Sequence, residues 1–313
     1  MLQSSDAQNS SNVTDTHDDG HTFTTVIISW ILLIVLGNIW LIVGIVRAKL
    51  FRTDSLYYYV ISVGASSAAV AGLVLPVFVI GHFMRPLLSD LLCKMCHYFN
   101  QLTAVANIAS QVTGTFSEWR IVYTGKQCPR RTHVRRLLLL WLAAAAYAAK
   151  MPLMFGLVEI TGAPGQAPTN DCGATGDPTF LFVASLVDFA LIGILMLAVS
   201  VALNVAICCR MTQKAERRGA AILTMLLVLQ LTLTVPLLAY DLAAFLKWTK
   251  ADPITHMRLI AVSFSFEWLS IVALLLVDGK VRAACTALVL CRSAERARQT
   301  AAVRDAHVAT TDS

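Results

Sequence analysis

Charged side chains are scarce in this sequence, and their scarcity excludes an ordinary soluble domain. Only 14% of the 313 residues are Asp, Glu, Lys or Arg, whereas 57% are hydrophobic. Soluble domains carry about 25% charged residues. The apolar residues fall in long runs instead of alternating with polar ones, which is typical of a chain that crosses a membrane several times.

Seven apolar runs have the length, about 20 residues or more, at which a helix spans the hydrocarbon core. A helix is required there because lipid offers the backbone no hydrogen-bond partners. The runs are 24–46, 57–81, 97–117, 137–157, 180–207, 220–246 and 257–277. They predict an all-α membrane protein, a seven-transmembrane helix bundle over 24–279. We expect a tail at 1–23, a short amphipathic helix 8 at 280–292 and a disordered tail at 293–313.

Lysine and arginine are missing from residues 1–23, and residues 1–22 also lack an apolar region, so no cleavable signal peptide is expected there. Most of the 25 Lys and Arg residues follow the first, third, fifth and seventh runs. By the positive-inside rule these segments are cytoplasmic, and the N-terminus is therefore extracellular. The net charge of +6 reflects this belt, which faces anionic membrane lipid and protein, and nothing in it indicates binding to nucleic acid.

The N-terminal tail is polar and carries two N-glycosylation sequons. They begin at Asn9 and Asn12, in a stretch rich in Ser and Asp that lacks the apolar residues of a core. An extracellular tail with two sequons is expected to be glycosylated at both.

The eight cysteines are too dispersed to form a disulfide scaffold. Cys93 and Cys172 both fall on the oxidising side and are the natural pair, although Cys96, one turn deeper, competes with Cys93. Cys285 and Cys291 lie in the expected helix 8, where they would turn to lipid as candidates for S-palmitoylation. The alternative is that they are free thiols that fill small gaps.

Several polar, proline and tryptophan residues stand at particular depths in the spans. A lone Asn such as Asn38 is costly within a membrane helix and usually bonds a neighbouring helix. The positions concerned are Gly37-Asn38, Leu75-Pro76, Trp141, Pro152, Pro236 and Val277-Asp278-Gly279-Lys280. Together they resemble the pattern of class A, rhodopsin-like G-protein-coupled receptors over residues 24–292. The resemblance implies a bend at Pro236 and a helix 8 that begins near 280.

Several switch positions of that class are replaced here. Ala68 stands where the class has an aspartate that binds sodium, and Glu118-Trp119-Arg120 stands for its Asp-Arg-Tyr motif. The proline and tyrosine expected in the seventh span are replaced, because Ser270-Ile271-Val272-Ala273-Leu274 occupies their place.

A sequence in which all these switch positions are replaced resembles the receptor homologues encoded by gammaherpesviruses. That resemblance implies signalling without ligand through inhibitory heterotrimeric G proteins, at the plasma membrane of the infected cell. It also implies down-regulation of class I histocompatibility molecules, and receptor homo- or heterodimers are a further expectation. Two alternatives stay open, a viral chemokine-binding receptor or scavenger, and a signalling-dead receptor that only binds host membrane proteins. The N-terminal tail has no cysteine for the second disulfide of chemokine receptors, which argues against the first.

The expected coupling site lies where the third span meets the cytosol. Glu118 either holds a basic residue of a neighbouring segment or is a solvated interface acid. Its expected neighbours are Trp119, Arg120, Arg130, Arg131, Arg217 and Arg218.

Glu267 is the least expected residue, because a carboxyl group deep in a membrane helix is costly unless it is protonated or paired. The hypothesis is that the acid missing at Ala68 is relocated to Glu267, facing Asn38, Ser66 or Ser67, and Asn107 or Ser110. The alternative is a neutral side chain with one interhelical hydrogen bond.

Asp188, Tyr240 and Asp241 lie in the outer thirds of their spans, where they either line a ligand cavity or reach towards the headgroups. An enzyme is not expected, because the spans contain no Gly-x-Ser-x-Gly motif. A retinal pump is excluded because 257–277 contains no lysine. No cofactor and no metal are expected.

Overall fold

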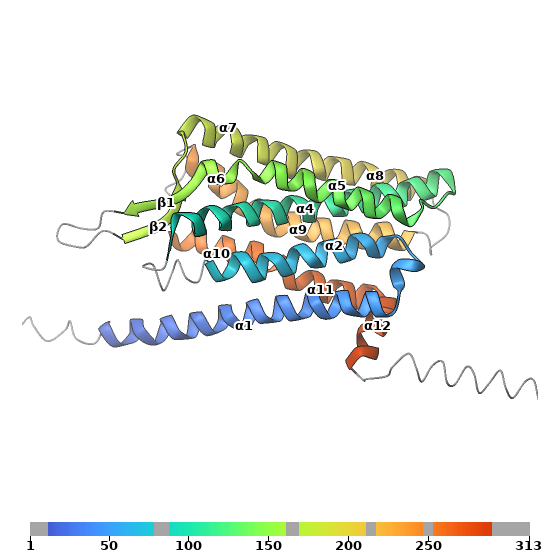
Figure 1. Cartoon of the computed structure of the whole chain (residues 1–313), viewed down its shortest axis with the longest axis horizontal. Coiled ribbons are helices and arrows are strands. Elements are labelled where there is room, and N and C mark those ends of the chain that lie inside the picture. Colours follow the sequence, from blue (N-terminus) through green and yellow to red (C-terminus); the bar gives the residue numbers. More distant parts are fainter. Residues whose placement is uncertain (1–11, 78–87, 161–168, 211–216, 247–252, 290–313) are drawn as a thin grey trace, which may run out of the picture.

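The computed structural model of the chain describes residues 12–77, 88–160, 169–210, 217–246 and 253–289 (Figure 1). Within these ranges the backbone is almost entirely helical, as the apolar runs predict. The helices are α1 (Asn12–Arg47), η1 (Leu50–Arg52), α2 (Leu56–Ala69), η2 (Val70–Val74), α4 (Asp90–Thr124), α5 (Arg130–Ala148), α6 (Met151–Met154), α7 (Pro178–Asp188), η4 (Phe189–Leu195), α8 (Met196–Arg210), α9 (Arg217–Phe245), α10 (Pro253–Phe264), α11 (Phe266–Val277) and α12 (Gly279–Val289).

Within the described residues, six helical segments are long and apolar enough to cross a membrane, which indicates a multi-pass membrane protein. They are Ile28–Arg47, Leu56–Val77, Arg130–Met154, Pro178–Ile207, Ala221–Tyr240 and Arg258–Val277. Each overlaps one of the predicted runs. The predicted run at 97–117 is the one that does not appear among them, and it falls within α4.

Helix α4 lies at the centre of the bundle (Figure 1) and packs against α2, α5, α8 and α9. Because these helices cover α4, its side chains that face them do not need to be apolar. Its buried polar side chains are Thr103, Asn107, Ser110, Gln111, Thr115 and Ser117. Polar side chains on a helix within a bundle can bond neighbouring helices, whereas lipid would leave them unpaired.

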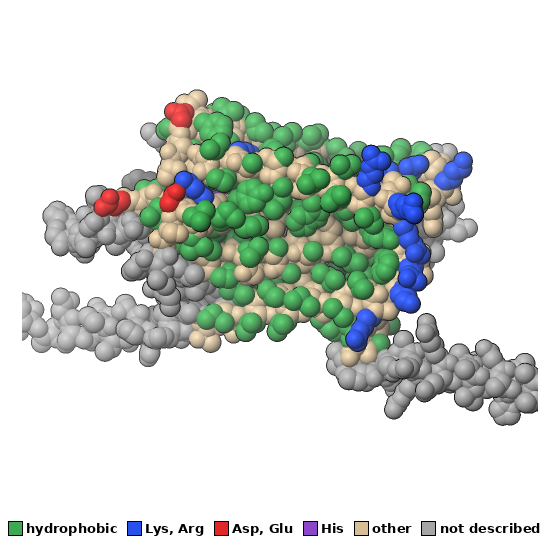
Figure 2. Space-filling model, viewed as in Figure 1, with side chains coloured by type: hydrophobic (Ala, Val, Ile, Leu, Met, Phe, Trp, Pro, Cys, Tyr) green, Lys and Arg blue, Asp and Glu red, His purple; other side chains and the backbone are tan. Residues whose placement is uncertain are grey.

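The surface of the bundle is apolar along its length and charged at one end. Figure 2 shows hydrophobic side chains across the middle and most of the visible Lys and Arg at a single end. We call this the basic end, where α1 ends and α5 and α12 begin (Figure 1). The opposite end carries a β-hairpin, and we call it the hairpin end.

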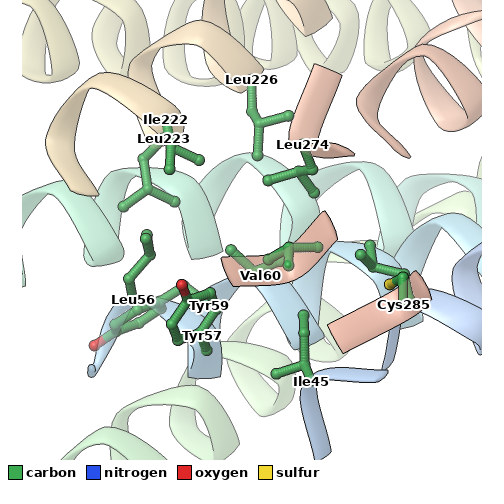
Figure 3. Close-up of a cluster of buried hydrophobic side chains, with 12 residues drawn as sticks. Ile45, Leu56, Tyr57, Tyr59, Val60, Ile222, Leu223, Leu226, Leu274 and Cys285 are labelled. Atoms are coloured by element: carbon green, nitrogen blue, oxygen red, sulfur yellow. The ribbon is translucent and has the colours of Figure 1, made fainter. Parts of the chain in front are cut away.

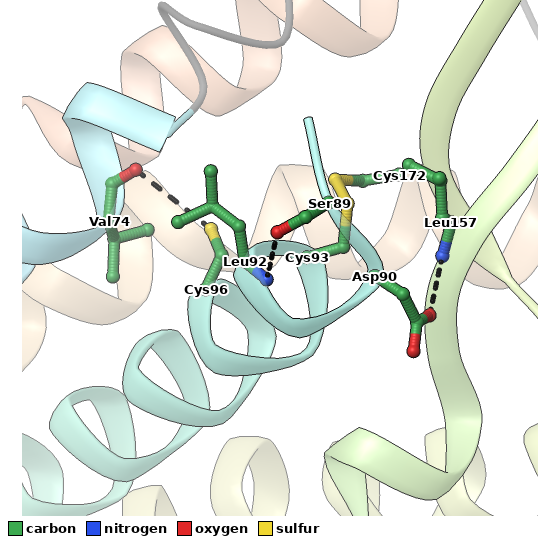
Figure 4. Close-up of a disulfide and its surroundings, with 8 residues drawn as sticks. All are labelled: Val74, Ser89, Asp90, Leu92, Cys93, Cys96, Leu157 and Cys172. Atoms are coloured by element: carbon green, nitrogen blue, oxygen red, sulfur yellow. Dashed lines mark hydrogen bonds between the residues drawn. A yellow bond between two sulfur atoms is a disulfide. The ribbon is translucent and has the colours of Figure 1, made fainter. Parts of the chain in front are cut away.

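The hairpin consists of strands β1 (Phe155–Ile160) and β2 (Thr169–Ala174), paired antiparallel with Leu157 opposite Cys172. A disulfide joins Cys172 to Cys93 in the first turn of α4, with Cα atoms 5.5 Å apart (Figure 4). The pairing of Cys93 with Cys172 is therefore confirmed over Cys96. The Cys96 thiol is buried and faces the backbone oxygen of Val74.

Two segment boundaries differ from the prediction. The fourth span was expected to reach 157, but its helical part ends at Met154 and β1 follows, because the ladder with β2 takes the backbone hydrogen bonds of that segment. Helix α1 begins at Asn12, so the later part of the tail expected at 1–23 is helical.

A hydrophobic cluster near the basic end joins α1, α2, α9, α11 and α12 (Figure 3). Its residues include Ile45, Leu56, Tyr57, Val60, Ile222, Leu223, Leu226, Leu274 and Cys285. Cys285 is 0% exposed, and a Cβ added at Gly44 of α1 would lie 3.0 Å from its sulfur. The expectation that Cys285 turns to lipid is therefore wrong, because the thiol fills the space that Gly44 leaves. Cys291 lies outside the described residues.

Candidate functional site

Two buried glutamines, Gln111 of α4 and Gln230 of α9, connect these two helices. The Gln111 amide Nε2 donates to Gln230 Oε1 at 2.7 Å and to Asn107 Oδ1, also at 2.7 Å. All three side chains are at most 5% exposed. Gln111 Oε1 is buried without a partner among the described residues. Asn107 was predicted as a polar core residue, and it acts here as the acceptor that orients Gln111.

A second polar cluster joins α2, α4 and α5. The Ser62 and Ser110 hydroxyl groups are 2.8 Å apart, and Trp141 Nε1 donates to Ser62 Oγ at 2.9 Å. Ser110 Oγ also donates to the Ala106 carbonyl on its own helix. These hydrogen bonds connect three helices, α2, α4 and α5. Trp141 and Ser110 were noted in the sequence analysis, whereas Ser62 was not.

Glu267 lies at the start of α11 and faces α1 and α2. Asn38 Nδ2 donates to its backbone oxygen at 3.4 Å and to the Ile34 carbonyl at 2.9 Å. The Ser67 hydroxyl interacts with the Glu267 carboxyl group. The geometry falls short of a regular hydrogen bond, because Ser67 Oγ and Glu267 Oε2 both lack partners among the described residues.

The structure places two of the expected neighbours next to Glu267. Asn38 and Ser67 are adjacent to it, but Asn107 and Ser110 are bonded in the two clusters described above. Hard cations take about six or more oxygen ligands. Among the described residues, the unpartnered oxygens of Glu267 and Ser67 supply two of these, and the relocation of the sodium-site acid to Glu267 stays a prediction.

At the basic end, Tyr59 of α2 joins α4 and α5. Its hydroxyl group lies 2.9 Å from Ser117 Oγ and 3.0 Å from His133 Nδ1. Arg136 Nη1 donates to the same Ser117 Oγ at 3.2 Å. His133 is 2% exposed and stacks on Tyr58 with an interplanar angle of 7°. The Ser117 hydroxyl group, one residue before Glu118, thus connects α4 to α2 and α5.

The Glu118 side chain points from α4 towards the first turn of α9. A Cβ added at Gly219 would lie 2.9 Å from Glu118 Oε2, so the carboxyl group rests against the α9 backbone. Burial raises the pKa of Glu118 to about 7, and the charge of Asp54 acts in the same direction. A hydrogen bond with Ser55 opposes this rise in pKa. Glu118 lies just beyond the predicted run at 97–117, and is held between α2 and α9.

Trp119 does not share the direction of Glu118. Trp119 packs against Ile207 of α8 and against the rings of Phe116 and Tyr123, with centroids 5.4 and 4.8 Å away. The central position of the motif thus faces α8. Arg120 is half-buried and forms no ion pair with a described carboxylate.

The other predicted coupling residues lie around the same end. Arg130 Nη2 donates to the Arg52 carbonyl at 3.4 Å, which connects the start of α5 to η1. Arg131 is exposed. Arg217 and Arg218 are the first residues of α9, two positions and one position before Gly219, and their side chains lie outside the description.

At the hairpin end, Asp188 is held by Tyr147 of α5 and by Lys150, which directly precedes α6. Lys150 Nζ lies 2.5 Å from Asp188 Oδ1, and the Tyr147 hydroxyl donates to the same oxygen. Tyr240 is half-buried in α9, and the side chain of Asp241 lies outside the description. Pro236 lies within α9. Asn12 is the first residue of α1, whereas Asn9 lies outside the described residues.

Asp278 is a buried acid whose role the sequence analysis missed. Its Oδ1 accepts from the backbone N–H groups of Lys280 and Val281, and the Tyr57 hydroxyl donates to its Oδ2 at 3.0 Å. Asp278 therefore caps α12 and ties that helix to α2. The cap was readable from an Asp that precedes a helix, but the bond to Tyr57 depends on packing.

No family model matches the chain, and no curated protein is significantly similar to it.

Proposed function

We propose that this chain is a G-protein-coupled receptor homologue of rhodopsin-like architecture that signals without ligand through inhibitory G proteins. The observation that carries the proposal is the central helix α4. It is bound by a disulfide to the hairpin at one end and presents Glu118 to α9 at the other end. Polar clusters join it to α2, α5 and α9 between these ends.

The basal activity follows in this proposal from the surroundings of Glu118. In the parent class an acid at this place pairs with an arginine in the inactive state. Here the next residue is Trp119, which packs against α8, and the Glu118 carboxyl group rests on the α9 backbone. Without that ion pair, the start of α9 is not held in an inactive position, and the basic end is open to a G protein. Down-regulation of class I histocompatibility molecules remains an expectation from the resemblance.

The test is basal cyclic AMP in cells that express the chain, with and without pertussis toxin, which blocks inhibitory G proteins. We expect lowered cyclic AMP that the toxin restores. Gly219→Ala should change this basal effect, because the added Cβ displaces Glu118. Gly193→Ala is the matched control, since its nearest neighbouring atom, on Phe189, would be 3.9 Å away.

A signalling-dead receptor is the second candidate, and the direction of Trp119 favours it. The class places an arginine at this position to contact the G protein, whereas Trp119 packs against Ile207. Normal cyclic AMP at normal surface expression, with or without toxin, would refute coupling and support this second candidate.

A further inference from the structure

The basic end carries a hollow on α5, and one of its lining residues, Arg131, is also a predicted coupling residue. Its lining residues are Arg131, Thr132, Arg135, Arg136 and Leu139, and we call it the α5 groove. Its volume of about 390 Å³ lies within the range of small-ligand pockets. It opens to the outside of the bundle, so its occupant would approach from the membrane or the adjoining water.

No carboxylate of the described residues neutralises the charges of the α5 groove. Among the described residues, no carboxylate forms an ion pair with Arg131 or Arg135, and both side chains are exposed. Arg136 is half-buried and fixed by its hydrogen bond to Ser117 Oγ. Three guanidinium groups and the Thr132 hydroxyl therefore offer donors to an anion, and guanidinium groups bind phosphate oxygens in pairs.

The surface next to the groove is apolar. Leu138, Leu139 and Leu142 are 61%, 55% and 58% exposed, and they follow Arg135 by three, four and seven residues. These spacings place them on the same face of the helix. The groove occupies the first turns of the candidate span Arg130–Met154, where headgroups meet the hydrocarbon core. An anion with an acyl chain can satisfy both parts of this surface at once.

We infer that the α5 groove binds one anionic phospholipid through a phosphomonoester headgroup, with its acyl chains along Leu139 and Leu142. A phosphomonoester carries between one and two negative charges near neutral pH, which suits three adjacent arginines better than a phosphodiester does. Basic pockets at the membrane edge are known to take such headgroups. The inference depends on the chain being a membrane protein, and does not depend on coupling to a G protein.

The experiment titrates fluorescent phosphatidic acid into the full-length protein purified in detergent. We expect the variant Arg131→Gln/Arg135→Gln to raise the Kd about tenfold, because two charge-assisted contacts are lost. The matched control is Arg47→Gln/Lys126→Gln, which removes two exposed charges at the same end but outside the groove. The control should change the Kd by less than about twofold.

Two further arms separate the sources of phosphate and guard against unfolding. Glycerol phosphate should compete poorly, and phosphatidylglycerol should bind more weakly than phosphatidic acid. The variant Arg131→Lys/Arg135→Lys keeps the charge but removes the planar guanidinium groups that bind phosphate through two hydrogen bonds each. Weaker binding by this variant, at an unchanged melting temperature, would show that the loss concerns lipid recognition and not folding. Equal losses in groove and control variants would overturn the site. So would full competition by glycerol phosphate, or binding only to an acidic peptide.

Discussion

At the scale of single residues, Glu118 is half-buried and forms no ion pair with a described basic side chain. Between pH 4.5 and about 7 the folded protein holds the Glu118 proton more tightly than the unfolded chain does, because burial raises the pKa. The contribution of Glu118 to stability is therefore present at low pH and is lost as pH rises through this window.

We predict that Glu118→Gln raises the melting temperature in detergent at pH 8 by about 3 °C and leaves it nearly unchanged at pH 5. The amide keeps the shape of the side chain and cannot ionise. Asp90→Asn is the control, because the hydrogen bond with Lys94 lowers the pKa of Asp90 and so places its titration below the window. A melting temperature for Glu118→Gln that falls at pH 8 would show that the charged form is stabilising.

Glu267 poses a different question, because its carboxyl group interacts with Ser67 while one oxygen of each side chain lacks a regular hydrogen bond among the described residues. Because these two oxygens are fewer than the about six that a hard cation takes, we predict that the melting temperature is the same in sodium chloride and in choline chloride. Glu267→Gln should match the wild-type value within about 2 °C in both salts, because an amide fills the same space. A stabilisation by sodium that Glu267→Gln abolishes would instead revive the relocation hypothesis.

At the scale of helices, the contact between α4 and α9 depends on Gln111 and Gln230. Interhelical hydrogen bonds in membrane proteins couple by about 0.6 kcal/mol on average and reach about 1.7 kcal/mol. We predict a coupling within this range for Gln111→Ala and Gln230→Ala, because the bond is buried and 2.7 Å long. The measurement is a double-mutant cycle on the free energy of unfolding in mixed micelles.

Thr232 provides the control for that cycle. It also lies on α9, but its hydroxyl group is exposed and donates to the Val228 carbonyl of its own helix. Gln111→Ala and Thr232→Ala should therefore be additive. If the Gln111 and Gln230 substitutions are also additive, the hydrogen bond does not hold α4 to α9.

The elements show why some features were predictable and others were not. Length and hydropathy define a membrane helix locally, so six runs reappear as candidate spans. Which residues meet across helices depends on the rotation of each helix, and no local pattern fixes it. Tyr59, His133 and the pair Gln111–Gln230 therefore went unpredicted. Cys93 and Cys96 share one face of α4, so only the position of β2 decided between them.

Errors at residue level have the same cause. Cys285 was expected to face lipid because helix 8 was treated as a helix lying on the membrane. In the structure α12 packs against α1, and Asp278 ties its start to Tyr57 of α2. The cysteine therefore fills a space in the protein.

At the scale of the whole molecule, the account depends on whether α4 crosses the membrane. The six candidate spans alone would bring both ends of the chain to the same side, because their number is even. A seventh crossing by α4 puts the ends on opposite sides. The polar residues of α4 are compatible with a crossing only because the neighbouring helices cover them.

The most direct measurement of this central claim is the sidedness of the two termini in living cells. The full-length chain would carry one epitope tag at each end and be stained before and after permeabilisation. The account predicts that the N-terminal tag is accessible on intact cells and the C-terminal tag only after permeabilisation. Glycans slow the protein on a denaturing gel. If the double variant Asn9→Gln/Asn12→Gln migrates faster than the wild type, the N-terminal end is glycosylated. Both tags on the same side would contradict a seven-helix receptor.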